Sequence, residues 1–204
     1  QFNHEVNALF EMNSEQMRQT VFDYTYWDDF VVAIEKNDTN WYNENISLNS
    51  FNFEYVCVYD TNFQLVYETS NNGFAEKNMI PKDAIKSLKL IRFSEFFVTT
   101  NSGLVEVNAA SVHPTNDPDH RKTQPSGYMF AARVWDKPFL DNLKEISGAE
   151  HKLIKVSDSI PGINEKSIMV SINLAGWDGK PVSRIIYSTT LDSNYDMAQN
   201  IIYS

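Results

Sequence analysis

Apolar and aromatic residues recur at steps of three and four between Phe2 and Ile34. This spacing places them along one side of a helix, so the pattern predicts a helix of about nine turns within residues 1–36. Such a length exceeds that of a usual globular helix and is typical of a coiled-coil or juxtamembrane segment. The apolar seam is sparse in its first half, where polar Asn13 falls on it. We therefore expect that half to need a partner helix.

Shorter apolar runs separated by turn-favouring residues follow, and they predict strands. Asp136 and Gly148 are placed to cap the two ends of one helix between these runs. Helical patterns span residues 41–46, 81–90, 137–146 and 192–204. The predicted strands span residues 53–60, 63–69, 96–100, 104–113, 127–135, 151–156, 168–174 and 182–189.

These strands follow one another as hairpins rather than through helical crossovers, which predicts an antiparallel sheet. We therefore expect an α+β fold in which helices cover one face of the sheet. No convincing linker divides the chain, so the prediction is a single domain over residues 1–204. It would consist of the long helix, a sheet core over 41–190 and an exit helix over 192–204.

The charge of the chain excludes some functions. The formal net charge is −10, and the only basic cluster is His120–Lys122. Because duplex binding needs clustered Lys and Arg, no nucleic-acid partner is expected. No run of 18 apolar residues exists, so no segment here is expected to span a membrane. The chain begins at Gln1 and ends in the apolar-leaning segment 197–203, which favours a piece cut from a longer protein.

Aromatic rings and carboxylates crowd together late in the predicted long helix and shortly after it. A purely structural helix would carry Leu and Ala there, so Tyr24, Trp27, Asp28 and Trp41 are candidates for one end of a binding pocket. The alternative is that the two tryptophans are core anchors and that Asp28 is a cap or a solvated charge.

A second set of candidates lies on the predicted strands. Arg133 interrupts the apolar run 127–135, and such an arginine is either paired with a carboxylate, for example Asp28, or available to an anionic ligand. Ser111 and His113 alternate with one residue between them, so they share a strand face. The predicted ligand is a small organic molecule with a carboxylate or an amine. The complete predicted ligand-binding set is Tyr24, Trp27, Asp28, Trp41, Ser111, His113 and Arg133.

Patterns of catalysis are missing from the sequence. There is no Gly-rich phosphate loop, no His-Glu-x-x-His and no Gly-x-Ser-x-Gly. The loop 114–126 contains three prolines, and its acids and histidines could bind a metal ion. An exposed, mobile, solvated loop is the favoured interpretation. We therefore expect neither a metal nor a cofactor, and we do not expect the chain itself to be an enzyme.

Several short motifs occur in the order and spacing of a known family. They are Tyr26–Asp29, Trp41–Asn45, Tyr55–Asp60, Gly127–Arg133, Phe139–Leu143 and Gly148. Over residues 20–190 the chain resembles the fourth class of CHASE domains, which are extracytoplasmic sensory modules. The resemblance implies a Cache-like, PAS-like sheet packed on a long N-terminal helix between two transmembrane helices. The proline-rich loop 114–126 departs from the family pattern.

The resemblance and the residues together lead to one expectation of function. The chain would be the ligand-sensing domain, outside the inner membrane of a bacterium, of a histidine kinase or a cyclic-di-GMP enzyme. It would form a homodimer through the N-terminal helix and transmit its signal through the terminal helices. The alternative is a periplasmic adaptor that binds a protein partner and has no small-molecule pocket. A hydrolase is the least supported function.

Overall fold

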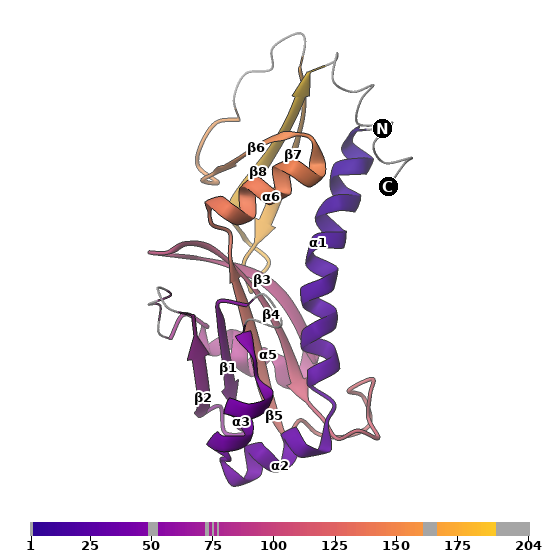
Figure 1. Cartoon of the computed structure of the whole chain (residues 1–204), viewed down its shortest axis with the longest axis vertical. Helices are drawn as coiled ribbons and strands as arrows, with labels where there is room; N and C mark the ends of the chain where they lie inside the picture. Colours follow the sequence, from indigo (N-terminus) through magenta and orange to yellow (C-terminus); the bar gives the residue numbers. More distant parts are fainter. Residues whose placement is uncertain are drawn as a thin grey trace.

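Two antiparallel sheets and a long helix make up the computed structural model, which describes residues 2–48, 53–71, 74, 76, 78–160 and 167–190 (Figure 1). The elements, in chain order, are α1 (Phe2–Tyr24), α2 (Asp28–Lys36), α3 (Thr39–Asn45), β1 (Tyr55–Tyr59), β2 (Leu65–Ser70), α5 (Lys82–Ile91), β3 (Phe93–Thr100), β4 (Gly103–Val112), β5 (Gly127–Val134), α6 (Lys137–Ser147), β6 (Glu150–Ile154), β7 (Ser167–Ala175) and β8 (Pro181–Thr190).

The predicted α+β class is confirmed. The larger sheet has the strand order β2-β1-β5-β4-β3, and the smaller one has the order β6-β8-β7. All pairs are antiparallel, as expected from the hairpins. Helix α1 runs beside both sheets (Figure 1). The predicted exit helix at 192–204 lies outside the described residues.

The prediction of one continuous helix up to Ile34 is wrong. Helix α1 ends at Tyr24, and α2 begins at Asp28 after Trp27 adopts an extended backbone. The hydroxyl of Thr25 donates to the carbonyl oxygens of Val21 and Phe22, which competes with the continuing helical pattern. The apolar spacing continues across this break because both helices bury side chains on the same face of the larger sheet. Periodicity alone therefore could not locate the turn.

Helices α1 to α3 cover that face with an aromatic core. Phe30 stacks on Trp41 with ring centroids 5.2 Å apart, and Tyr42 stacks on Tyr67 of β2 at 4.7 Å. A Cβ atom on Gly127 would lie only 2.7 Å from the Tyr59 carbonyl oxygen. Glycine at this position therefore allows the close packing of β5 against its surroundings. The buried core on this face includes Met17, Val21, Phe30, Ala33, Ile34, Tyr42, Val56, Val58, Ala110, Val112, Met129 and Ala131.

The expectation that helices cover only one face is also wrong. Helix α5 packs on the opposite face, where Ile85 and Leu88 join Phe96, Val107 and Phe130 in a second core. Strand β1 is buried along its whole length, because both of its faces are covered. A strand buried on both faces reads as a continuous apolar run, so its sequence does not reveal which face carries which helix.

The first half of α1 belongs to a third core under the smaller sheet. Phe2 and Val6 are 3% and 0% exposed, and they share this core with Trp135, Leu174 and Ile185. The chain's own smaller sheet therefore covers the buried residues in this half of the apolar seam, and their burial does not require a partner helix. Among the described residues, no helix has the length and the apolar character needed to cross a membrane.

Candidate functional site

The break after α1 meets the end of β4 at His113. The His113 amide donates to the Thr25 carbonyl oxygen at 2.7 Å, which connects the turn to the sheet. The His113 ring is fully buried, with Nε2 2.9 Å from Ser111 Oγ and Nδ1 2.8 Å from Thr123 Oγ1. The side chains of Ser111 and His113 therefore do lie on the same side, as predicted, although His113 is one residue beyond the end of β4. Burial lowers the pKa of His113, and nearby Asp117 partly opposes this effect.

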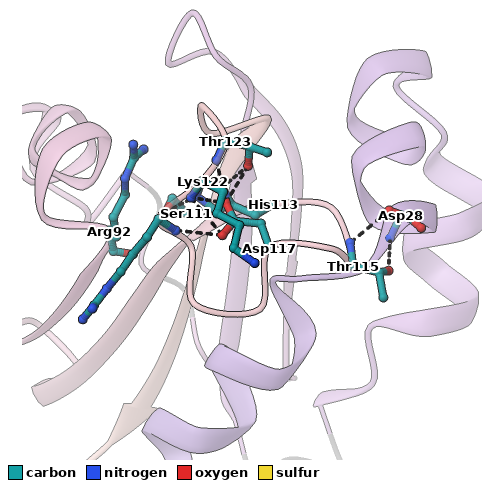
Figure 2. A network of polar contacts seen from close by, with 9 residues as sticks. Asp28, Arg92, Ser111, His113, Thr115, Asp117, Lys122 and Thr123 are labelled. Carbon is teal, nitrogen blue, oxygen red and sulfur yellow. Dashed lines mark hydrogen bonds and ion pairs between the residues drawn. The ribbon is translucent and has the colours of Figure 1, made fainter.

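Asp117 organises the loop that follows β4 (Figure 2). Its carboxylate accepts hydrogen bonds from the amides of Arg121, Lys122 and Thr123 and from the Thr123 hydroxyl. Burial alone would raise the pKa of Asp117, but these hydrogen bonds lower it below its usual range. Most residues of the loop 114–126 are exposed, as expected, but the loop is held in place by the completely buried Asp117.

His120 lies in a stack of three rings. Its ring centroid is 4.8 Å from that of Phe22 on α1 and 4.7 Å from that of His113. The side chain is 1% exposed, and neither ring nitrogen has a hydrogen-bond partner among the described residues. Burial, followed by the neighbouring His113, lowers the pKa of His120 to about 4. The ring is therefore neutral at pH 7.

The side chains of Ser111, His113 and Asp117 contact one another in the sequence serine, histidine, aspartate that a hydrolase triad uses. His113 Nε2 contacts Ser111 Oγ, and His113 Nδ1 lies 3.2 Å from the Asp117 carboxylate. A nucleophile must reach its substrate, however, and Ser111 is 0% exposed. Its hydroxyl also lies 3.3 Å from the Arg92 carbonyl oxygen. This network therefore supports the loop and β4 rather than a reaction.

A groove of about 620 Å³ lies beside this network. It is bounded by α1, by the end of α5 with the start of β3, and by the loop after β4. Its volume falls within the range of small-molecule sites. The groove is lined by Glu15, Arg18, Gln19, Phe22, Leu90, Ile91, Arg92, Phe93, Asp119, His120 and Arg121.

The groove gathers three of the chain's five arginines. Arg18 forms salt bridges with Glu15 and, at 3.4 Å, with Glu95. Burial and the nearby Glu106 raise the pKa of Glu95, and the positive charge of Arg18 opposes this shift. Arg92 and Arg121 form no salt bridge within the described part of the chain. The groove can therefore take an anion at guanidinium groups that the protein leaves unpaired.

The comparison with protein families decides which family this fold represents. The CHASE4 domain profile matches residues 9–153, which is more than half of the chain. The chain belongs to the CHASE4 domain family. This CHASE4 domain is thus a sensory domain of the type found in signalling receptors. A search of curated protein sequences gave no significant match.

Two solved structures are similar to this CHASE4 domain over almost its whole length. The periplasmic domain of LuxQ from Vibrio cholerae is 12% identical, with a TM-score of 0.62, over 95% of this chain and 98% of that one. The sensory domain of the Campylobacter jejuni chemoreceptor Tlp3 is 9% identical, with a TM-score of 0.52, over 94% of this chain and 90% of that one. At such low identity, the likeness establishes the fold and nothing finer.

The aromatic residues predicted for the site lie at the end of the CHASE4 domain near the α1–α2 turn. Tyr24 and Trp27 pack together with ring centroids 4.5 Å apart, and Trp41 stacks on Phe30. Asp28 is exposed, and its carboxylate accepts a hydrogen bond from the Thr115 amide (Figure 2). These contacts match the alternative interpretation, in which the tryptophans anchor the core and Asp28 is a cap-like charge. Their binding role stays a prediction.

Arg133 lies in a different part of the CHASE4 domain. Its guanidinium contacts Glu106 at 2.8 Å and the Asn13 carbonyl oxygen at 3.4 Å. Asn13 is about 16 Å along α1 from Tyr24 at the rise of an α-helix. The expected carboxylate partner therefore exists, but it is Glu106 and not Asp28. The structure brings Ser111 together with His113 and Tyr24 together with Trp27, but it does not bring Arg133 to either pair.

Sequence reasoning missed most of the groove. In the sequence, Phe22 and Ile91 are ordinary apolar positions. Arg92 is a single basic residue between α5 and β3. The basic cluster His120–Lys122 was the one signal that falls at the groove. The described residues contain no group of three or more His, Cys, Asp or Glu side chains placed to hold a metal ion.

Proposed function

We propose that this CHASE4 domain is the extracytoplasmic ligand-sensing domain of a membrane-bound histidine kinase or cyclic-di-GMP enzyme. Its small organic ligand binds in the groove beside α1. The supporting observation is the position of α1, which lines the groove with Arg18, Gln19 and Phe22. The same helix inserts Phe2 and Val6 into the core of the smaller sheet. A ligand in the groove therefore contacts the element that joins both sheets.

Signalling requires that the ligand favour one of two packings of α1. The contact between Arg18 and Glu95 provides such a choice, because a negative charge in the groove also attracts the Arg18 guanidinium and so weakens its hold on Glu95. Glu95 is partly buried and close to Glu106, so a loss of Arg18 raises the electrostatic cost of its charge. Binding is thereby coupled to the fit of α1 on β3.

The solved relatives support the cellular location. The similar LuxQ domain is described as periplasmic, and the similar Tlp3 domain is described as the sensory domain of a chemoreceptor. By analogy we place this domain outside the inner membrane of a bacterium, between transmembrane helices that the chain does not include. Homodimer formation through α1 stays a prediction.

The alternative of a periplasmic adaptor for a protein partner draws on one observation. Leu90 and Ile91 are 85% and 54% exposed where they line the groove, which is unusual for adjacent large apolar residues. A partner protein could cover them. The groove itself favours the small-molecule function, because an adaptor has no need of a cavity between α1 and the loop.

Filling the groove tests the proposal. Gln19 lines the groove from the exposed side of α1, so Gln19→Trp places a large ring in the ligand's space. Gln16→Trp is the matched control, because Gln16 is exposed on the same helix and does not line the groove. In the full-length receptor, we expect Gln19→Trp to fix the signalling output and Gln16→Trp to leave it responsive.

A thermal-shift screen of the purified domain supplies the ligand class. The panel contains amino acids, carboxylates, amines, sugars and divalent metals, and a compound that binds only the folded state raises the midpoint. We expect one class to raise the midpoint of wild type and Gln16→Trp but not of Gln19→Trp. If Gln19→Trp and Gln16→Trp behave alike in both experiments, the groove is not the sensing site.

A further inference from the structure

Unpaired positive charge is the first feature of the groove that points to a ligand. In a protein of net charge −10, arginines are expected to find carboxylate partners. Arg92 and Arg121 have none among the described residues, and the buried Nη1 atom of Arg92 has no hydrogen-bond partner there either. A guanidinium binds planar carboxylates with two parallel hydrogen bonds, so this pair selects for an anion.

His120 adds a buried polar group without a partner. The residue is only 1% exposed, and neither buried ring nitrogen has a hydrogen-bond partner within the described part of the chain. Such groups carry a free-energy cost that a hydrogen-bonding ligand removes. Burial is the main cause of the lowered pKa of His120, and the positive charge of Arg92 contributes to it. The positive charge of Arg92 therefore acts on the His120 ring, which lines the same groove.

The groove also has an apolar wall. Phe22, Ile91 and Phe93 line it from α1, α5 and β3, and Leu90 extends this surface with 85% of its area exposed. Burying such surface against a hydrocarbon chain is favourable in proportion to the area removed from water. A ligand that is only a small inorganic anion would leave the wall uncovered.

The charges limit the ligand to a single negative charge. Arg18, Arg92 and Arg121 line the groove together with Glu15 and Asp119, so three positive groups face two negative ones. The surplus is one positive charge. A dianion such as a phosphate monoester would meet repulsion from the two acids that the surplus does not offset.

We propose that the groove binds a small monocarboxylate with an apolar body, held by Arg121, Arg92 and His120 at its carboxylate and by Phe22, Ile91 and Phe93 along its body. This inference rests on the proposed function, because it names the ligand class of the same site.

Calorimetric titration of the domain with 4-methylpentanoate tests the carboxylate. The neutral 4-methylpentanamide keeps the body without the charge, and acetate keeps the charge without the body. We expect each analogue to bind about tenfold more weakly than 4-methylpentanoate or worse. Equal binding of the amide would overturn the role of the charge, and an absence of 4-methylpentanoate binding would overturn the inference as a whole.

Two pairs of variants locate the binding. Arg121 and Lys122 are both exposed neighbours on the loop, but only Arg121 lines the groove. We expect Arg121→Gln to weaken the binding of 4-methylpentanoate about tenfold. Lys122→Gln should change the affinity by less than about twofold. Ile91→Ser tests the wall in the same way against Ile146→Ser, since Ile146 is 60% exposed on α6 outside the groove. Equal effects within either pair would overturn the assignment.

The failure of this inference is distinguishable from the failure of the proposed function. If another compound class binds and Gln19→Trp abolishes its binding, the groove is the sensing site and the assignment of a carboxylate ligand is wrong. If 4-methylpentanoate binds with the expected variant pattern but receptor output ignores Gln19→Trp, the carboxylate site is correct and the sensing function is wrong.

Discussion

His120 stacks on Phe22 with ring centroids 4.8 Å apart and ring planes 15° apart. The contact joins residues 98 positions apart in the chain, one on α1 and one on the loop after β4. On its other side His120 stacks on His113, so the rings connect α1 to β4 through the loop. A change in the position of α1 therefore shifts the His120 ring, which lines the groove.

Removing the Phe22 ring tests this connection. Phe22 also lies 5.8 Å from the Phe93 ring, so Phe22→Ala loses contacts to both walls of the groove. We expect Phe22→Ala to lower the free energy of unfolding by about 2 kcal/mol, as for a partly buried aromatic residue. Urea unfolding measures this loss. Met12→Ala on the same helix is the control, since Met12 is 70% exposed, and a comparable loss there would contradict the stacking role.

Asp117 is expected to hold the loop 114–126 in place. Asp117→Asn cannot accept from three amides and a hydroxyl as a carboxylate does, so the free energy of unfolding falls by about 3 kcal/mol. Limited proteolysis should then cut the loop, while the exposed control Asp119→Asn stays intact. If both variants resist cleavage as wild type does, the loop does not depend on Asp117.

The lowered pKa of His120 makes stability depend on pH. The folded pKa of about 4 is below the value of 6.5 for a free histidine, so the unfolded chain binds more protons. The stability that the neutral ring provides is complete above pH 6.5 and is lost as the pH falls towards 4. We expect this loss to be about 2 kcal/mol after allowance for solvent screening.

Urea unfolding at pH 7 and at pH 4.5 measures this effect against His120→Asn. Asparagine tolerates the positive φ of 55° at this position and does not titrate. Glu54 and Glu95 have raised pKa values and are present in both proteins, so their effects cancel in the difference. An equal pH dependence of wild type and His120→Asn would show that another group is responsible.

Glu106 is the buried charge between α1 and the sheet. It is 0% exposed and accepts hydrogen bonds at 2.8 Å from both Arg133 and the indole of Trp135. Glu106→Gln leaves the guanidinium of Arg133 without its counter-charge, and we expect a loss of about 3 kcal/mol in unfolding free energy. Adding Arg133→Met should recover most of that loss. The double variant would be no more stable than the single one if the ion pair were unimportant.

Sequence patterns located the elements well where each signal was local. Asp136 and Gly148 do cap α6, as predicted. The motifs also indicated the correct family, whose profile matches residues 9–153. Local hydrogen-bonding and conformational preferences determine such features, and the sequence displays them directly.

The candidate groove could not be predicted in the same way. Its walls come from α1, from the α5–β3 junction and from the loop 119–121, which are brought together only by the packing of two helices on opposite faces of a sheet. Arg133 shows the same limit, because its partner Glu106 is a cross-strand neighbour in a register that the sequence does not specify. A lone arginine in an apolar run indicates a partner without naming it.

Helix α1 is shared between two cores, and this has a consequence for how the protein unfolds. Phe2 and Val6 complete one apolar interior, while Met17 and Val21 complete another. Fraying of the first two turns would open the smaller sheet to water, and it would leave the larger sheet largely intact. The local melting of the smaller sheet thus depends on the N-terminal end of α1. Tension applied at that end would be resisted first by two buried side chains.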